Sequence, residues 1–113
     1  MFGVRAVYDV LREQTGDATR LLLSGGLTKS PLVRAMIADV FGVPALEPQQ
    51  PEASALGAAL LAAEARGLVA DADEAARAFG YDAPTTPNPA NAPAYRDAYA
   101  RYRRAVEAAL SAL

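Results

Sequence analysis

Apolar residues recur at helical spacing in the first fifteen residues of the chain. Val4, Val7 and Leu11 fall on one face of such a helix, charged residues fall on the other, and Gly16 follows as a residue that commonly ends helices. The pattern predicts an amphipathic helix over residues 1–15. Because only three residues precede the pattern, two interpretations of the N-terminus stay open: a short natural start, and a cut within a longer chain.

The spacing of apolar residues changes abruptly in the central stretch of the chain. The apolar run Leu21–Leu23 is too short for a helix and is apolar at each position, which predicts a strand covered on both faces over residues 20–24. Gly25 and Gly26 end the run. Glycine permits positive φ and close approach of the backbone to another group, so the pair predicts an exposed turn that can serve as a ligand platform.

A second apolar segment follows this turn. Ser30-Pro31 is a favourable helix start, with serine at the N-cap and proline at the first helical position, and Gly42 is suited to end the helix. Residues 43–46 predict a second short strand. Strand, helix and strand in this order predict a parallel βαβ unit, and therefore an α/β fold.

The next helix is predicted over residues 55–66, with Ser54 as its cap. One face of this helix carries only glycine and alanine, including Gly57. A glycine inside a helix costs about 1 kcal/mol relative to alanine, so a structural need for space is expected. We expect a strand or the Gly25-Gly26 turn to lie closely against this face.

The C-terminal third combines a short helix, a proline-rich segment and a long helix. Residues 71–79 predict a helix with an aspartate cap and Phe79 as its apolar anchor. Four prolines within residues 82–93 predict an extended surface linker. Residues 94–113 predict an amphipathic helix, and the tyrosines on its apolar stripe are interpreted as packing residues: Tyr95, Tyr99 and Tyr102.

Composition narrows the chemistry that these elements can perform. The chain has 113 residues, a formal net charge of −2, and neither cysteine nor histidine. These numbers predict one domain and exclude disulfides, thiol catalysis, the common zinc sites and a histidine base. The charge argues against nucleic acid or an anionic membrane surface as a partner. We recognise no membrane span and no signal peptide, so we expect a cytoplasmic protein.

The glycine turn is the first candidate for a functional site. The bare backbone of Gly25-Gly26 can lie against a phosphate or a purine, and the following helix adds partial positive charge at its N-terminus. An ordinary tight turn explains the same two glycines. Lys29 does not complete a phosphate-binding P-loop, because Leu23 and Thr28 stand where that motif needs glycine.

The remaining polar candidates are explained by structural roles. Ser30 is accounted for by its capping position, which is compatible with a second role at a ligand. Asp39 and Glu52 are the acids near the central unit, and neither has a carboxylate or histidine beside it in the sequence. We therefore predict no catalytic residue and no metal ligand in this chain.

Residues 20–67 resemble a known family. The segment SGGLTKSPLVRAMIADVFGVPALEPQQPEASALGAALLAAEARG joins a strand running into Gly-Gly, a K-S-P-L-x-R-x-x-x-A-D-V-x-G helix and an E-A-S-A-L-G-A-A-L-L-A helix. Together these parts resemble the C-terminal nucleotide-binding region of the FGGY carbohydrate kinases of the actin-like ATPase superfamily. The S-G-G-x-x-K-S-P form with A-D-V-F-G is most similar to the gluconate kinases.

The resemblance implies a fold and a division of the chain. The fold is part of an actin-like ATPase (ribonuclease H-like) domain, a short parallel βαβ unit flanked by helices. Residues 1–80 correspond to the C-terminal nucleotide-binding subdomain, residues 81–93 to a proline-rich linker, and residues 94–113 to the C-terminal amphipathic helix of the same domain.

The resemblance also implies a reaction, the phosphorylation by ATP of a sugar or of a sugar acid such as gluconate, with Mg²⁺. By position, Gly25, Gly26 and Leu27 correspond to the turn against the adenosine and α-phosphate of ATP. Ser30 corresponds to a side chain that faces adenine. Ser24 departs from many relatives, which have glycine or aspartate there, and this bears on the contacts at that edge of the nucleotide.

In the family, the sugar site, the catalytic aspartate and the first phosphate loop lie upstream of the matched region. The implied partners are therefore ATP or ADP, and a sugar bound by the N-terminal part of a kinase. We expect no kinase activity from these 113 residues alone. The alternative is a non-catalytic nucleotide-binding or dimerisation module. Part of a kinase would leave the apolar face of residues 1–15 uncovered and could form a homodimer, whereas an independent module would cover its own edges.

Overall fold

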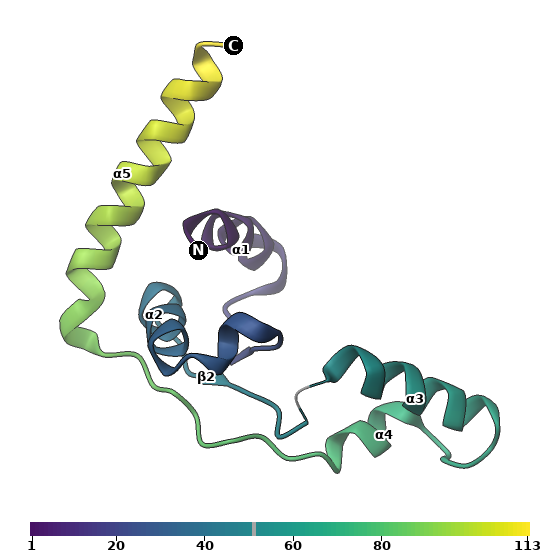
Figure 1. Ribbon diagram of the computed structural model, residues 1–113. Helices are drawn as coiled ribbons and strands as arrows, with labels where there is room; N and C mark the ends of the chain where they lie inside the picture. Colours follow the sequence, from purple (N-terminus) through teal and green to yellow (C-terminus); the bar gives the residue numbers. More distant parts are fainter. Residues whose placement is uncertain (51) are drawn as a thin grey trace.

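The computed structural model describes residues 1–50 and 52–113 (Figure 1). Helices dominate, and the sheet consists of two very short strands. In chain order the elements are α1 (Phe2–Thr15), β1 (Leu21–Leu22), the 3₁₀ turn η1 (Gly26–Lys29), α2 (Pro31–Phe41), β2 (Ala45–Leu46), α3 (Ala53–Ala65), α4 (Ala72–Arg77), the 3₁₀ turn η2 (Pro89–Asn91) and α5 (Ala92–Ser111).

β1 and β2 form the parallel unit predicted from the sequence. Leu21 pairs with Ala45 and Leu22 pairs with Leu46, while α2 connects the two strands. The amide of Leu21 donates to the carbonyl of Pro44 at 2.8 Å. The strand–helix–strand prediction is confirmed. Leu22 is 55% exposed, however, so the expectation of a strand covered on both faces is wrong for the described residues.

The second edge of β2 is occupied by a segment from much later in the chain. Ala45 and Thr85 exchange two antiparallel backbone hydrogen bonds, of 2.9 and 2.8 Å. Part of the segment predicted to be a surface linker is therefore bound to the sheet. Among the described residues, β2 has neighbours on both sides and β1 is an edge strand.

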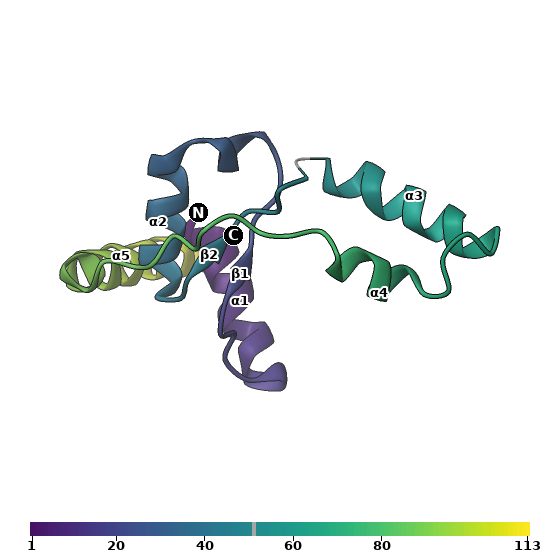
Figure 2. The same ribbon diagram turned by 90° about the horizontal axis from the view of Figure 1, so that it is seen from below.

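α3 and α4 form an arm that stands away from the other helices (Figures 1 and 2). The chain enters and leaves the arm through two antiparallel segments, in which the amide of Gln49 donates to the carbonyl of Gly80 at 3.0 Å. α3 begins at Ala53 after Glu52, so the prediction that Ser54 caps this helix is wrong. Ser54 lies within the first turn instead. The aspartate cap predicted for α4 is Asp71, whose carboxylate accepts from the amide of Glu74 at 2.8 Å.

Aromatic side chains join α5 to α1. The ring of Phe2 lies 5.7 Å from that of Tyr99 and 5.8 Å from that of Tyr102, measured between centroids. Tyr8 of α1 meets Phe41 of α2 edge-on at 5.4 Å. The interpretation of Tyr99 and Tyr102 as packing residues is confirmed. Beyond this contact, the second half of α5 extends away from the rest of the molecule (Figure 1).

The molecule has an extended shape and a sparse core. Its accessible surface is 7899 Å², whereas a compact monomer of this mass exposes about 5,900 Å². Its radius of gyration is 17.5 Å, against about 13 Å for a compact domain of this length. The buried apolar residues among those described are all small or medium-sized: Ala38, Val40, Ala45 and Ala72.

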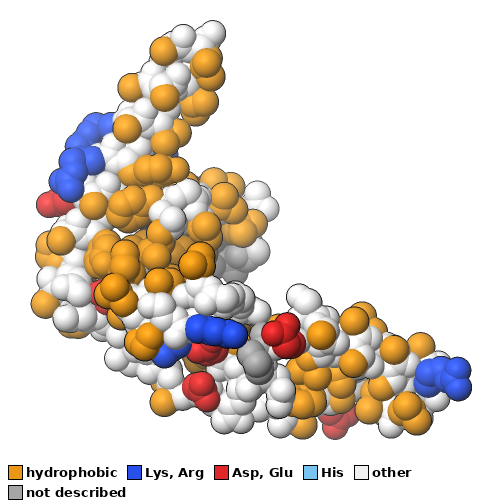
Figure 3. Space-filling model, in the orientation of Figure 1, with side chains coloured by type: hydrophobic (Ala, Val, Ile, Leu, Met, Phe, Trp, Pro, Cys, Tyr) orange, Lys and Arg blue, Asp and Glu red, His pale blue; other side chains and the backbone are white. Residues whose placement is uncertain are grey.

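An apolar groove of about 530 Å³ runs between α1, β1 and α2. We call it the α1 groove. Val7 is 60% exposed within it, and the space-filling view shows apolar side chains gathered over this part of the molecule (Figure 3). The uncovered face expected for residues 1–15 is therefore present. The α1 groove is lined mainly by aliphatic residues, including Val4, Val7, Leu11, Leu22, Val33 and Ile37.

Candidate functional site

The predicted ligand turn lies at the carboxyl end of β1, where parallel α/β sheets commonly bind ligands. Gly25 has φ 106° and ψ 169°, a conformation that side-chain-bearing residues rarely adopt, and Gly26 then begins η1. Both glycines are exposed, and the side chain of Leu27 is 80% exposed. The turn is thus open to solvent, as expected for a ligand platform.

Gly26 has no explanation within the described chain. Its φ is not positive, and a Cβ added there would meet no atom within 4 Å. Neither backbone conformation nor crowding therefore requires glycine at this position. A side chain would project into the open space beside the turn, which is the space that a ligand against the backbone would need.

Ser30 begins α2, but in a different way from the one predicted. Its backbone is extended at φ −79° and ψ 120°, and Pro31 follows at the first helical position. Within the described residues, the hydroxyl of Ser30 makes no capping hydrogen bond. Its amide donates to the carbonyl of Leu27 at 3.4 Å, which continues the 3₁₀ turn into the helix. The hydroxyl is therefore available to a ligand.

A network of polar side chains that the sequence did not predict holds the turn on its protein side. Thr28 is 7% exposed, and its hydroxyl donates to the carbonyl of Gly25 at 2.7 Å. Nη1 of Arg34 donates both to the carbonyl of Thr28 and to Oε2 of Glu47, each at 2.8 Å. The Thr28 hydroxyl also lies 3.4 Å from Oε1 of Glu47. The network joins the turn to α2 and to the end of β2.

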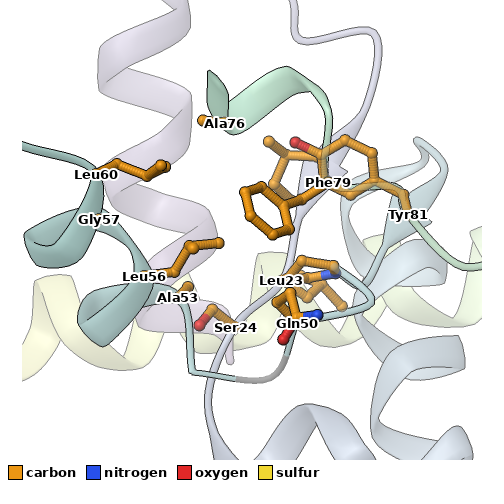
Figure 4. A pocket seen from close by; sticks show the side chains of 12 residues that line it. Leu23, Ser24, Gln50, Ala53, Leu56, Gly57, Leu60, Ala76, Phe79 and Tyr81 are labelled. Carbon is orange, nitrogen blue, oxygen red and sulfur yellow. The ribbon is translucent and has the colours of Figure 1, made fainter. Parts of the chain in front are cut away.

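A second hollow lies beside the turn, between the end of β1 and the α3–α4 arm. It has a volume of about 230 Å³ and is mostly apolar, with Leu56, Leu60 and Phe79 directed toward it (Figure 4). Gly57 also borders this cavity, and a Cβ there would meet no atom within 4 Å. The expectation that a strand or the glycine turn lies closely against the small face of α3 is therefore wrong in this structure, because part of that face borders open space.

Asp39, one of the two acids near the central unit, has a structural role. Asp39 accepts from the amide of Asn88 at 2.6 Å and from Nδ2 of Asn91 at 2.7 Å, which fixes the start of α5. Within residues 1–50 and 52–113, no group of three acidic, histidine or cysteine side chains is placed to hold a metal ion. None of the helices in this part of the chain combines the length and apolar character needed to cross a bilayer.

Sequence comparison gives relatives among sugar and polyol kinases. Residues 1–66 match the model of the FGGY family of carbohydrate kinases, C-terminal domain. The chain is 36% identical over 104 residues to glycerol kinase 2 of Streptomyces avermitilis, with 91% of this chain and 20% of that protein covered. It is 35% identical over 103 residues to ribulokinase of Mycolicibacterium smegmatis, with 89% of this chain and 18% of that protein covered. The chain thus spans about a fifth of the length of these relatives.

Solved structures give the same result for the fold. The crystal structure of xylulose kinase from Lactobacillus acidophilus superposes with a TM-score of 0.84 at 29% identity, covering 98% of this chain and 22% of that one. Gluconate kinase from the same organism superposes with a TM-score of 0.71 at 30% identity, covering 80% and 18%. The predicted actin-like ATPase fold is confirmed. With more than half of its residues matching the family model, the chain belongs to the FGGY family of carbohydrate kinases and corresponds to their C-terminal domain.

Proposed function

We propose that this chain forms the nucleotide-binding wall of a kinase that transfers phosphate from ATP to a sugar, a sugar acid or a related polyol. The observation that carries the proposal is the open turn at the end of β1, where Gly26 lacks a side chain for no reason internal to the described residues. Because the chain belongs to the carbohydrate kinases, we propose that the group occupying this space is the nucleotide.

The residues of the turn have distinct proposed roles. The backbone of Gly25, Gly26 and Leu27 lies against the adenosine and the α-phosphate of ATP, where side chains would prevent close approach. The hydroxyl of Ser30, which has no capping bond among the described residues, faces the adenine. These groups bind and orient the nucleotide. They are not proposed to touch the phosphoryl group that is transferred.

The metal and the sugar are proposed to bind elsewhere in the kinase. Mg²⁺ accompanies ATP in phosphoryl transfer and neutralises charge on the phosphates. The described residues offer no cluster of acidic ligands for it, so we assign the metal to parts of the kinase outside this chain. The sugar site is assigned to those parts too. Relatives named for glycerol, ribulose, xylulose and gluconate leave the substrate class broad, and gluconate stays within it.

The same proposal gives the α1 groove an occupant in the kinase. Part of the polypeptide that makes up the other four fifths of the relatives would cover this apolar surface. An independent module would cover its own apolar faces, and the exposed side chains of Val4, Val7 and Leu11 argue against that alternative.

With a net charge of −2 and no spanning helix in the described part, we propose cytoplasmic action with ATP and a sugar, and without nucleic acid or membrane.

Titration of the ¹⁵N-labelled chain with ADP, followed by NMR, tests the nucleotide site. We expect the amide signals of Gly25, Gly26 and Leu27 to move, and Gly26→Val to abolish the movement while circular dichroism shows the same helix content. Gly57→Ala, at a half-buried glycine of α3, is the control. Signals that move instead around Leu56 and Phe79 would place the nucleotide in the adjoining cavity and overturn the roles given to the turn.

A coupled assay of ADP release tests whether these residues suffice for catalysis. Phosphoryl transfer depends on positioning and on electrostatic stabilisation by several phosphate-binding parts acting together. We therefore expect no turnover by the 113 residues with gluconate, xylulose or glycerol in the presence of Mg²⁺ and ATP. Turnover above the rate without protein would contradict the assignment of catalysis to other parts of the kinase.

A further inference from the structure

The backbone hydrogen bonds within the glycine turn are long. The amide of Thr28 donates to the carbonyl of Gly25 at 3.2 Å, and the amide of Ser30 donates to that of Leu27 at 3.4 Å. Both distances lie at or beyond the long end of the usual range for N–H···O bonds. Gly25 and Gly26 have wide conformational freedom, so these backbone bonds alone are a poor means of keeping a single conformation. The short contact within the turn runs through the side chain of Thr28, whose hydroxyl donates to the carbonyl of Gly25 at 2.7 Å.

Two charged side chains supply stronger contacts from outside the turn. Arg34 lies in the first turn of α2, and Glu47 follows β2 directly. One nitrogen of Arg34 bonds the carbonyl of Thr28 and the carboxylate of Glu47, each at 2.8 Å. Hydrogen bonds with a charged partner are shorter and stronger than neutral ones. We call this pair, with its bond to Thr28, the Arg34–Glu47 latch.

The latch differs from the ion pairs on the surface of the molecule. The side chains of Arg34 and Glu47 are 24% and 20% exposed. Those of Arg103 and Glu107, whose charged atoms lie 3.8 Å apart on α5, are 51% and 68% exposed. Exposed pairs contribute little, because solvent screens them and ordering their side chains costs entropy. The partly buried latch, with its additional bond to the backbone of the turn, restrains conformation more strongly.

We infer that Arg34 and Glu47 are positioning residues that hold the turn from Gly25 to Ser30 in its nucleotide-binding conformation. The inference rests on the proposed function, because it assigns a purpose to the order of that turn. Neither side chain is proposed to touch the nucleotide. Both act through Thr28, whose carbonyl Arg34 holds and whose hydroxyl lies beside Glu47.

Preorganisation is the physical basis of the effect. If the binding-competent conformation is populated for only part of the time, the apparent nucleotide affinity is the intrinsic affinity multiplied by the populated fraction. Loss of the latch frees the two glycines to adopt other conformations. The nucleotide then has to order the turn as it binds, which weakens the affinity without removing any direct contact.

The test uses amide hydrogen exchange and ADP titration of the whole chain, both followed by NMR. Arg34→Met and the isosteric Glu47→Gln remove the charges of the latch. We expect each to speed exchange of the Thr28 and Ser30 amides by about tenfold, the change expected on losing one charged hydrogen bond, and to weaken ADP binding by up to the same factor. The double variant should be no worse than either single one, because the two residues act as a unit.

Two further variants separate positioning from a general change of charge. Arg34→Lys keeps a positive donor that can serve both acceptors, so it should restore most of the exchange protection and of the ADP affinity. Glu107→Gln removes a carboxylate from the exposed pair on α5 and should change neither measurement. Circular dichroism of all variants verifies that the helices are retained.

The outcomes distinguish this inference from the proposed function. If the unaltered chain shows no ADP binding, the proposed function is contradicted, and exchange of the turn amides still decides whether the latch orders the turn. Unchanged exchange in both Arg34→Met and Glu47→Gln overturns the latch. ADP binding that is as tight in these variants as in the unaltered chain overturns its role in nucleotide affinity.

Discussion

Nη1 of Arg5, in α1, donates a hydrogen bond to the carbonyl oxygen of Val40, 2.7 Å away in the last turn of α2. The Nε of the same guanidinium bonds Asp9 at 2.9 Å. The last turn of α2 contains no basic residue of its own, so Arg5 supplies the positive charge that favours the carbonyl end of this helix. The guanidinium also lies within 6 Å of three aromatic rings, from α1, α2 and α5: Tyr8, Phe41 and Tyr99.

Replacement of Arg5 therefore tests how the three helices are joined. Arg5→Met keeps an apolar stem but leaves the Val40 carbonyl without its charged donor, and we expect it to lower the free energy of unfolding by about 2 kcal/mol. Urea denaturation followed by circular dichroism measures the change. Arg12→Met is the control, since Arg12 forms longer contacts of 3.8 and 3.6 Å to Asp9 and Asp17, and it should change stability by less than about 1 kcal/mol. Equal losses in both variants would contradict a special role for Arg5.

Asp9 and Tyr99 make the contact between α1 and α5 dependent on pH. The hydroxyl of Tyr99 donates to Oδ2 of Asp9 at 2.7 Å. Burial acts to raise the pKa of Asp9, but the hydrogen bond from Tyr99 and the charges of Arg5 and Arg12 outweigh it and bring the pKa below the usual 3.8. Burial, followed by the bond to Asp9, raises the pKa of Tyr99 above the usual 10.0.

These directions give stability that is lost at both ends of the pH range. The lowered pKa of Asp9 stabilises the folded chain above pH 3.8, and this contribution is lost as pH falls through the folded-state pKa. The raised pKa of Tyr99 stabilises it below pH 10.0, and that contribution is lost as pH rises through the folded-state value. Unfolding free energies measured across the pH range should fall less steeply at low pH in Asp9→Asn and at high pH in Tyr99→Phe. Unchanged profiles would show that the contact does not form in solution.

The two glycines of the turn should respond oppositely to alanine. Gly25 has φ 106°, where alanine is strained, so Gly25→Ala should lower the free energy of unfolding by about 1 kcal/mol or more. Gly26 has no positive φ and open space at its Cβ, so Gly26→Ala should leave stability unchanged or raise it by about 0.5 kcal/mol. Thermal and urea unfolding measure both. A large loss from Gly26→Ala would mean that the chain itself requires this glycine, and would remove the main support for a ligand there.

The α1 groove predicts self-association of the chain when it is alone in solution. The molecule exposes about 2,000 Å² more than a compact monomer, which exceeds the roughly 800 Å² that each partner buries in a stable interface of standard size. We expect sedimentation equilibrium to show a concentration-dependent homodimer. Val7→Lys places a charge in the groove and should give a monomer. Leu68→Lys, at an exposed apolar position that does not line the groove, should dimerise like the unaltered chain. A monomer at all concentrations would contradict this prediction.

The sequence predicted features that depend on neighbouring residues. Gly16 and Gly42 end their helices with φ of 81° and 70°, because a positive φ after a helix favours glycine wherever the rest of the chain lies. The parallel strands followed from strand, helix and strand in succession. The contact of Thr85 with Ala45 could not be predicted in this way, because the two residues lie far apart in the sequence and neither belongs to a recognisable pairing motif.

In the candidate site, too, the sequence predicted only the features that depend on neighbouring residues. The openness of the turn at Gly25 and Gly26 follows from glycine chemistry, while the roles of these residues and of Leu27 and Ser30 at a nucleotide stay predictions, as does the division of the chain near residues 80 and 93. The Arg34–Glu47 latch carried no sequence signal, because a lone arginine and a lone glutamate on different elements match solvent-exposed residues equally well. Only their meeting at Thr28 distinguishes them.

Because Thr85 pairs with one side of β2, the edge of the sheet that stays open to a further strand, within the described part of the chain, is that of β1. With that side of β2 taken, an additional strand can pair directly with this two-stranded sheet along β1, whose outer edge is unpaired among the described residues. Such an addition would convert β1 from an edge strand into an interior strand. The glycine turn would then follow an interior strand of a wider sheet, with a neighbouring strand on each side of β1.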